Sequence, residues 1–243
     1  MRKNLIFGAD PEFFAAKNGE IIPGTMLIPS TIDTGWGYIT NDGIVLEINP
    51  FPGEIQRLLD NLMGLVDVAM RETGCELIFE PRYRVSEAII ELAGTYDTSA
   101  LEFGCSPDRN IYDDAMSARM DASKHPWRYA GGHIHIASGK MDPWLVISSL
   151  ECELSDDINA NSSIEEEYER RKYYGRAGCF RKKPYGAEWR TPSAAIFKSI
   201  AGSNYNVPLS VILSKSEEVI QAGVERRLTE IEDARIKING YGG

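Results

Sequence analysis

Four short segments that alternate polar and apolar residues constrain the fold of this chain more than any other feature. They cover residues 8–14, 45–50, 131–136 and 186–190. Successive side chains of a β-strand point to opposite faces, so each segment would place its polar residues on one side and its apolar residues on the other. The pattern predicts strands of a sheet with one packed face and one polar face.

Each of these segments carries two polar side chains separated by one residue. In chain order the pairs are Asp10 and Glu12, Glu47 and Asn49, His133 and His135, and Glu188 and Arg190. One such pair is ordinary on any half-exposed strand. Four pairs that include two of the three histidines favour a functional site. Gly131 and Gly132 precede the histidines, and we expect them to let a ligand approach the backbone.

Carboxylates and imidazoles on adjacent strands would form a metal cage of oxygen and nitrogen atoms. Oxygen-rich cages favour hard cations, so we expect Mg²⁺, with Mn²⁺ as the alternative. An arginine beside such a cage indicates a phosphate to be held or a negative charge to be stabilised. The residues therefore indicate phosphoryl transfer to a carboxylate, with metals that bridge the phosphates.

A basic stretch leads into the fourth segment and carries Arg176, Arg181, Lys182 and Lys183. As a loop beside metal-bound phosphates, it would counter the negative charge of a nucleotide. For Lys182 and Lys183 a solvated charged loop is the competing interpretation. The chain contains no GxxxxGK[ST] sequence, which excludes a P-loop enzyme.

Composition argues against several classes of partner. The net charge of −10 and the pI near 4.9 disfavour nucleic acid and anionic membranes. No apolar run approaches the roughly 18 residues of a membrane helix, and the N-terminal one is too short for a signal peptide, so we expect a cytoplasmic protein. The four cysteines include no CxxC pair, and we expect reduced, mostly buried thiols.

The wider pattern predicts an α+β chain without regular βαβ alternation. Expected strands cover residues 5–7, 12–16, 37–40, 44–49, 77–79, 100–104, 129–137 and 186–191, with a hairpin turn at 17–20. Expected helices cover 54–73, 142–159, 162–174 and most of 193–237, with a break near 204–208; Gly74 would end the first and Asp142 would cap the second. Residues 86–92 fit either a strand or a helix. We expect one domain over residues 1–238 and a flexible tail over 239–243.

Four motifs in this order resemble the phage-type amidoligases, which are carboxylate–amine ligases in the superfamily of glutamine synthetase and glutamate–cysteine ligase. The motifs are Gly-Ala-Asp-Pro-Glu, Glu-Ile-Asn-Pro, Gly-Gly-His-Ile-His-Ile and Lys-Pro-Tyr-Gly-Ala-Glu-Trp-Arg-Thr, between residue 8 and about residue 195. The resemblance implies an α+β, glutamine-synthetase-like catalytic domain with a curved antiparallel β-sheet and helices packed on its outer face. A phage-encoded protein would act in the host cytoplasm.

The resemblance also implies roles for individual residues. The metal ligands would be Asp10, Glu12, Glu47, His133 and Glu188, with Asp10 in place of the more usual glutamate. Arg190, Arg181 and Glu12 would be catalytic. ATP would contact His135, Arg181, Arg176 and Lys183.

The reaction implied by the resemblance is ATP-dependent amide formation through an acyl phosphate. Residues 102–112 and 174–186 would act as lids that keep water from this intermediate. The substrates stay open among an amino acid, a peptide and a modified metabolite. Three alternatives also stay open: a guanidino-kinase-like phosphotransferase, a metal hydrolase that combines the two histidines with Glu47, and a non-catalytic family member.

The number of subunits is also open. Because the chain has 243 residues and is short compared with glutamine synthetase, we expect it to lack the separate β-grasp domain whose subunit contacts help form the active site of that enzyme. A narrow apolar stripe near the C-terminus would either pair with another subunit of a homo-oligomer or cover the sheet. It consists of Ile220, Val224, Leu228 and Ile231.

Overall fold

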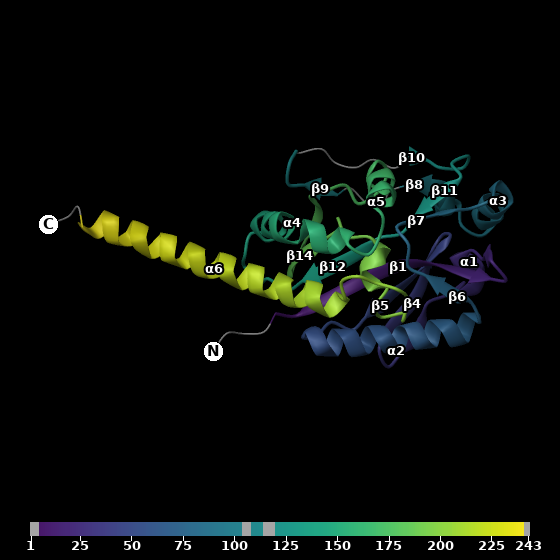
Figure 1. Cartoon of the computed structure of the whole chain (residues 1–243), viewed down its shortest axis with the longest axis horizontal. Helices are drawn as coiled ribbons and strands as arrows, with labels where there is room; N and C mark the ends of the chain where they lie inside the picture. Colours follow the sequence, from purple (N-terminus) through teal and green to yellow (C-terminus); the bar gives the residue numbers. More distant parts are fainter. Residues whose placement is uncertain (1–4, 104–107, 114–119, 241–243) are drawn as a thin grey trace.

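The computed structural model describes residues 5–103, 108–113 and 120–240, with side chains described as far as residue 223 and at residue 226. Its centre is an antiparallel sheet with the strand order β3-β4-β5-β1-β12-β14-β13-β9 (Figure 1). In that order the strands are Ile32–Thr34, Gly37–Asp42, Val45–Pro50, Phe7–Lys17, Gly132–Ile136, Gly186–Trp189, Cys179–Lys183 and Arg109–Asn110. Two further strands, β2 (Glu20–Ile21) and β6 (Glu76–Ile78), pair with β1.

The four alternating segments are neighbours at the middle of this sheet, as β5, β1, β12 and β14. Their register aligns the polar positions across the strands. Opposed pairs are Glu47 with Glu12, Asp10 with His133, and His135 with Glu188. Because opposed residues of an antiparallel pair share a face, all six side chains lie on the same side of the sheet.

The other face of the sheet is the main core. Phe13, Leu46, Ile134 and Trp189 are fully buried there. Helices α2 (Ile55–Thr73), α4 (Pro143–Asn159) and α6 (Leu209–Gly240) cover the sheet or pack on one another beside it (Figure 1). The α+β class and a large antiparallel sheet with packed helices are confirmed, whereas the glutamine-synthetase-like arrangement stays a prediction.

Two of the helices form as their end signals predict. The apolar face of α2 buries residues such as Leu58, Leu62 and Leu65, and the helix ends at Gly74, whose φ of 60° lies in the left-handed region. Asp142 caps α4 by accepting a hydrogen bond from the Trp144 amide at 3.0 Å.

One open alternative is decided and one expected strand is corrected. Residues 87–92, which fitted either a strand or a helix, belong to a helix, α3 (Glu87–Tyr96), because the Ser86 side chain accepts a hydrogen bond from the Ile89 amide and caps it. The strand expected at 100–104 is confirmed only over β8 (Glu102–Phe103), because a 3₁₀ turn, η1 (Thr98–Leu101), capped by Asp97, takes residues 100 and 101. Gly104 of that strand lies outside the described residues.

Two helical stretches are shorter than expected. The capping box of Ser163 and Glu166 starts α5 (Ile164–Arg171), and the chain turns after it. Between residues 193 and 203 the helix is limited to the 3₁₀ turn η2 (Ala194–Phe197). The remaining elements are α1 (Gly24–Leu27), β7 (Arg82–Arg84), β10 (Met120–Asp121) and β11 (Trp127–Tyr129), with β7 paired to β11 and β8 to β10.

The basic stretch is not a loop throughout, which corrects the sequence-based expectation. Residues 179–183 form β13, which pairs with β14 and brings Arg181 opposite Glu188. The alternation of a strand puts Arg181 and Lys183 on the polar face and leaves Lys182 exposed. Much of the lid expected at 174–186 is therefore part of the sheet, and the lid expected at 102–112 includes residues 104–107, outside the described part.

The C-terminal part of α6 extends away from the rest of the protein (Figure 1). Of the expected tail, residues 239 and 240 belong to α6, and residues 241–243 lie outside the described part. Ile220 is buried, but the other side chains of the apolar stripe are outside the described set. Across the described ranges, every helix is too short or too polar to span a bilayer.

The burial of the cysteine thiols agrees with the expectation in part. Cys75 and Cys179 are buried, but Cys152 is exposed on α4, which corrects the expectation for that residue. It directly follows Glu151, which faces the core and accepts a hydrogen bond from the Trp189 indole, so Cys152 points away from the sheet. Cys105 lies outside the described residues.

Candidate active site

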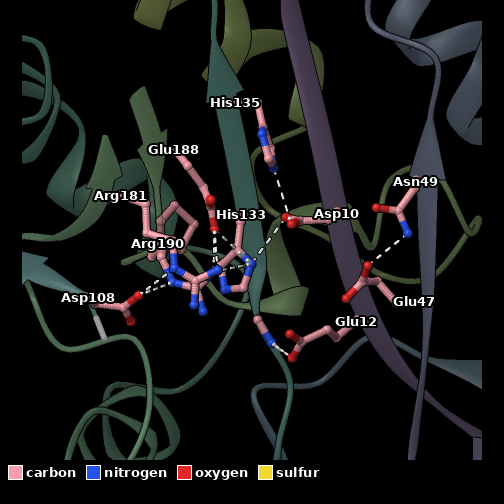
Figure 2. Close-up of polar contacts among 12 residues, drawn as sticks. Asp10, Glu12, Glu47, Asn49, Asp108, His133, His135, Arg181, Glu188 and Arg190 are labelled. Atoms are coloured by element: carbon pink, nitrogen blue, oxygen red, sulfur yellow. Dashed lines mark hydrogen bonds and ion pairs between the residues drawn. The ribbon is translucent and has the colours of Figure 1, made fainter. Parts of the chain in front are cut away.

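Three carboxylates form one group on the polar face, here called the acidic cluster: Glu12, Asp42 and Glu47. One oxygen from each lies within 4.8 Å of the others. The Asn49 amide donates a hydrogen bond of 2.7 Å to Glu47 Oε1 and orients that carboxylate (Figure 2). Asp42 was expected only as a turn residue. It reaches the cluster because Thr40 pairs with Glu47, and a residue two positions further shares that face.

The acidic cluster holds like charges close together. Burial, followed by the charges of Asp10 and Glu12, raises the pKa of Glu47 well above its usual value. Part of the Asp42 side chain reaches solvent, but desolvation of its carboxyl, followed by the Glu12 charge, raises its pKa to about 6. A divalent cation would relieve this repulsion, and an all-oxygen donor set suits a hard cation such as Mg²⁺.

A second group, here called the histidine cluster, consists of Asp10, His133, His135 and Glu188. Asp10 lies between the two imidazoles, with Oδ1 3.1 Å from His133 Nδ1 and Oδ2 3.1 Å from His135 Nε2 (Figure 2). Burial raises the pKa of Asp10, but the two histidines outweigh it and hold that pKa below its usual range. Glu188 Oε1 is 3.9 Å from His133 Nδ1, so two carboxylates, of Asp10 and Glu188, converge near this nitrogen.

Three basic side chains surround Glu188 and are called the cation group: Arg181, Lys183 and Arg190. Lys183 Nζ lies 2.6 Å from Glu188 Oε2, Arg190 contacts Oε1, and Arg181 approaches Oε1 at 3.7 Å. Burial raises the pKa of Glu188, but Arg190 and the other positive neighbours lower it overall. The charge of Glu188 is therefore compensated by the protein, unlike that of the acidic cluster.

Asp108 was not expected at the site, yet it bridges two residues of the cation group. Its Oδ1 lies 3.0 Å from the Nε atoms of both Arg181 and Arg190. The carboxylate fixes the two guanidinium groups side by side (Figure 2). Asp108 precedes a two-residue strand and shows no periodic pattern in the sequence, so no local signal predicts it.

Tyr174 also went unpredicted, and it connects the two clusters. Its hydroxyl donates to Glu12 Oε1 at 2.6 Å, lies 3.1 Å from His133 Nε2, and accepts from Arg190 at 3.3 Å. Behind it, Arg170 is fully buried and donates to four backbone carbonyls that flank the site. These belong to Ala130, Gly175, Thr191 and Pro192. Arg170 thus ties together the segments that carry the site residues.

Protein atoms fill the space beside Gly131 and Gly132, so the expectation that these glycines let a ligand approach the backbone is wrong. A Cβ atom at Gly131 would lie 2.5 Å from His133 Nε2 and 3.0 Å from the Tyr174 ring. At Gly132 it would lie 2.1 Å from the Ser193 carbonyl oxygen. In addition, the Gly131 amide donates a hydrogen bond of 2.7 Å to Glu12 Oε2 and holds that carboxylate.

Arg176 is the expected ATP contact that the structure places elsewhere. It pairs with Asp113 at 2.7 Å, and both side chains are half exposed. Arg176 precedes β13, so the strand register that aligns Arg181 and Lys183 with Glu188 does not extend to it.

Two cavities flank the polar strip, which is the band of polar side chains on β5, β1, β12 and β14. One, of about 390 Å³, has mainly apolar walls and includes His135 and Tyr185, which hydrogen bond to each other. The other, of about 170 Å³, borders Glu12 and Asp42. Gly8 lines the first, and β1 runs from Gly8 past Asp10 to Glu12, so the cavities lie at opposite ends of the strip.

The sequence from residue 109 to residue 226 matches a family described as phage phiEco32-like COOH.NH2 ligase-type 2. The matched part contains both histidines, Glu188 and the cation group, whereas β1 and β5 lie before it. A comparison with curated proteins finds no match. The family match confirms the resemblance drawn from the ordered motifs.

Proposed function

Taking the match to a phage-type amidoligase family as the premise, we propose that this protein is a carboxylate–amine ligase that uses ATP and Mg²⁺. One observation carries the proposal beyond the family description. The acidic cluster and the cation group lie side by side on one sheet face, and the Tyr174 hydroxyl contacts a member of each. Such a face can hold metal ions and phosphate oxygens together, as phosphoryl transfer requires.

The metal ligands we propose are divided between the clusters. Glu12, Asp42 and Glu47 suit one Mg²⁺, because they offer only oxygen and repel one another without a cation. Asp10, Glu188 and a histidine would hold a second ion, in competition with Lys183 and Arg190 for Glu188. His135 has a ligand atom within 4.8 Å of both carboxylates, and His133, the histidine expected from the sequence, has Nδ1 3.1 Å from Asp10 and 3.9 Å from Glu188. Bound Mg²⁺ would supply charge neutralisation for the phosphates and hold their oxygens in place.

The cation group would bind the phosphoryl group in transfer. Asp108 already orients Arg190 and Arg181, so the donors are in place before ATP arrives. Preorganised donors stabilise developing negative charge without reorganisation. The apolar cavity beside His135 and Tyr185 suits the base of the nucleotide, since such pockets combine apolar walls with a few polar groups.

The proposed reaction has two steps. An oxygen of the substrate carboxylate bonds to the γ-phosphorus of ATP, and the bond to the departing ADP breaks. The amine nitrogen then bonds to the acyl carbon, inorganic phosphate leaves, and the nitrogen loses a proton. Glu12, His133 and Arg190 are at most 3% exposed, which limits the access of water to this end of the site.

The hydrolase alternative does not fit the arrangement of the strands. It requires Glu47 beside both histidines. Glu47 on β5 instead pairs with Glu12 on β1, whereas the histidines lie on the other side of β1, where His133 pairs with Asp10 and His135 with Glu188. No comparable feature favours a phosphotransferase that stops after the first step.

An isotope experiment tests the two-step route. The protein is incubated with Mg²⁺, ATP and a mixture of amino acids and dipeptides whose carboxylates carry oxygen-18. An acyl phosphate passes one carboxylate oxygen to the phosphate released, so we expect ADP together with labelled phosphate. Release of ADP with unlabelled phosphate would show attack by water and would overturn the ligase route. No ADP release from the mixture, with folding verified by circular dichroism, would count against amino acids and dipeptides as carboxylate donors.

A further inference from the structure

We propose that the cavity of about 170 Å³ beside the acidic cluster, here called the amine cavity, binds the amine substrate as an organic cation. The proposal rests on the proposed function, because it assigns a place and a chemical class to one of the two substrates. The substrate so defined is an amine with a carbon skeleton and not free ammonia. Three properties of the cavity support this assignment: its charge, its aromatic walls and its size.

The charge of the lining favours a cation. Among the residues that the structure describes, three carboxylates, from Glu12, Asp42 and Glu102, line the cavity together with one guanidinium, from Arg128. Two nitrogens of Arg128 donate to four backbone carbonyls, among them that of His125 at 2.7 Å, so its charge is solvated by the protein. Glu12 and Asp42 also belong to the proposed Mg²⁺ site. The four carboxylates of the described lining and the acidic cluster outnumber the positive charges of one Mg²⁺ and Arg128, so this region stays negative, whereas the cation group lies on the other side of the site. An ammonium group is attracted to the first region and a carboxylate or phosphate to the second.

Aromatic rings form part of the wall. Phe103 and Tyr129 pack with their ring centres 5.2 Å apart, and Tyr174 adds a third ring. Arginine guanidinium groups already lie over the rings of Phe103 and Tyr174, 5.4 Å and 5.5 Å from the ring centroids, so these rings would mainly cover the hydrocarbon chain of the amine. Because the Tyr174 hydroxyl contacts both Glu12 and Arg190, an amine in this cavity would lie next to the centre at which the acyl phosphate forms.

The cavity is larger than ammonia requires. A single water needs about 10–15 Å³ on the scale used for such cavities, and ammonia is about as large. A cavity of about 170 Å³ therefore accepts several non-hydrogen atoms. One donor in the wall also lacks a partner: Arg128 is 5% exposed, and its Nε finds no acceptor among the described residues. An oxygen on the carbon skeleton of the amine would satisfy it, as in an amino alcohol or an amino acid.

Ligand-observed NMR on the full chain tests the cavity with two probes of the same length. Aminobutanol carries an ammonium group, and hydroxybutyrate carries a carboxylate. We expect saturation transfer from the protein to aminobutanol, weaker or no transfer to hydroxybutyrate, and little displacement of aminobutanol by ammonium chloride. A preference for hydroxybutyrate, efficient displacement by ammonium, or absence of aminobutanol binding to the folded protein would overturn the proposal.

Matched variants locate the binding. Ser99 lines the cavity and is exposed, so Ser99→Leu should obstruct it and weaken aminobutanol binding by about tenfold or more, which is about 1.4 kcal/mol. Thr98→Leu, in the same 3₁₀ turn but outside the lining, is the control and should bind as the native protein does. Glu102→Gln removes one charge of the lining and should also weaken binding. Unchanged affinity in both Ser99→Leu and Glu102→Gln would contradict this location.

The same samples are titrated with ATP in the presence of Mg²⁺, which separates the two proposals. Binding of ATP without binding of aminobutanol overturns the amine cavity and leaves the proposed function intact. Binding of aminobutanol without binding of ATP supports the cavity and overturns the ATP-dependent function.

Discussion

The Tyr174 hydroxyl donates a hydrogen bond of 2.6 Å to Glu12 Oε1, across a separation of 162 residues in the chain. The same hydroxyl contacts His133 and Arg190, so one oxygen atom connects the acidic cluster, the histidine cluster and the cation group. These contacts make Tyr174 a residue that positions the site.

Tyr174→Phe tests this role. The variant keeps the ring but removes the donor to Glu12, so we expect metal affinity and turnover to fall by about 10- to 100-fold, as for other residues that orient metal ligands. Stability should fall by about 1–3 kcal/mol, because the hydrogen bond goes to a charged group. Tyr173→Phe is the control, since the Tyr173 ring stacks on Tyr129 at 5.4 Å and should keep that contact. Equal metal affinity in both variants would contradict the positioning role.

Arg190 and its partners give a second prediction. Arg190 is 2% exposed and pairs with Glu188 and Asp108, so Arg190→Ala removes one buried cation from each of two buried carboxylates and should destabilise the fold by about 3–5 kcal/mol. Arg190→Lys keeps the charge but loses the planar fork, and we expect it to fold while turnover falls by about 100-fold or more. Chemical unfolding and steady-state kinetics check the two effects. Native turnover in a folded Arg190→Lys protein would exclude a role in phosphate binding.

The two arginines of the basic stretch should differ in their effect on ATP. Arg181 lies in the cation group, whereas Arg176 pairs with Asp113 at the surface. We expect Arg181→Ala to weaken ATP binding by about tenfold or more and Arg176→Ala to change it little, because exposed ion pairs contribute about 0–1 kcal/mol. Calorimetry with Mg²⁺ and ATP measures both. A larger loss in Arg176→Ala would restore the role expected from the sequence.

The acidic cluster predicts an unusual pH dependence of stability. The pKa of Glu47 lies well above its usual value and that of Asp42 is about 6, so the folded state binds more protons than the unfolded state. The free energy of unfolding of the metal-free protein should therefore fall as pH rises from about 4 to about 7. Asp10 and Glu188 have the opposite effect on stability, but their lowered pKa values move most of that effect below about pH 4. Bound Mg²⁺ should abolish the decrease in the free energy of unfolding as pH rises.

Glu47→Gln provides the matched test of this pH dependence. It removes one of the repelling charges, so the decrease in stability between about pH 4 and pH 7 should become smaller. Glu20→Gln, at an exposed position in β2, should leave the decrease unchanged. Thermal unfolding across this pH range measures the slope in each protein. Identical slopes for native protein and Glu47→Gln would show that the cluster is not strained by like charges.

The sequence predicted the polar face because its signal is local. Alternation within four short segments is enough to put Asp10 with Glu12 and His133 with His135 on one side of a strand. The same rule explains why Phe13 and Trp189 are buried behind them. The order of the strands then depends on pairing between distant parts of the chain, which the alternation alone does not determine.

The residues that were missed reach the site by other means. Asp42 belongs to the face only through the register between β4 and β5. Asp108 and Tyr174 lie outside the strands of the polar strip, and Tyr174 is brought in by the carbonyl contacts of the buried Arg170. Arg176 was assigned to the site because of its charge. In the structure it pairs at the surface with Asp113, which lies 63 residues away in the chain. Long-range contacts decide each of these cases.

Calorimetric titration of ATP tests the central claim most directly. It is carried out with and without Mg²⁺ on native protein, on Glu12→Gln, and on Glu20→Gln as the surface control. The metal-dependent site predicts that native protein and Glu20→Gln bind ATP only when Mg²⁺ is present, and that Glu12→Gln loses this binding while it remains folded. Folded native protein that binds no ATP, or Glu12→Gln that binds as tightly as native protein, would contradict the claim.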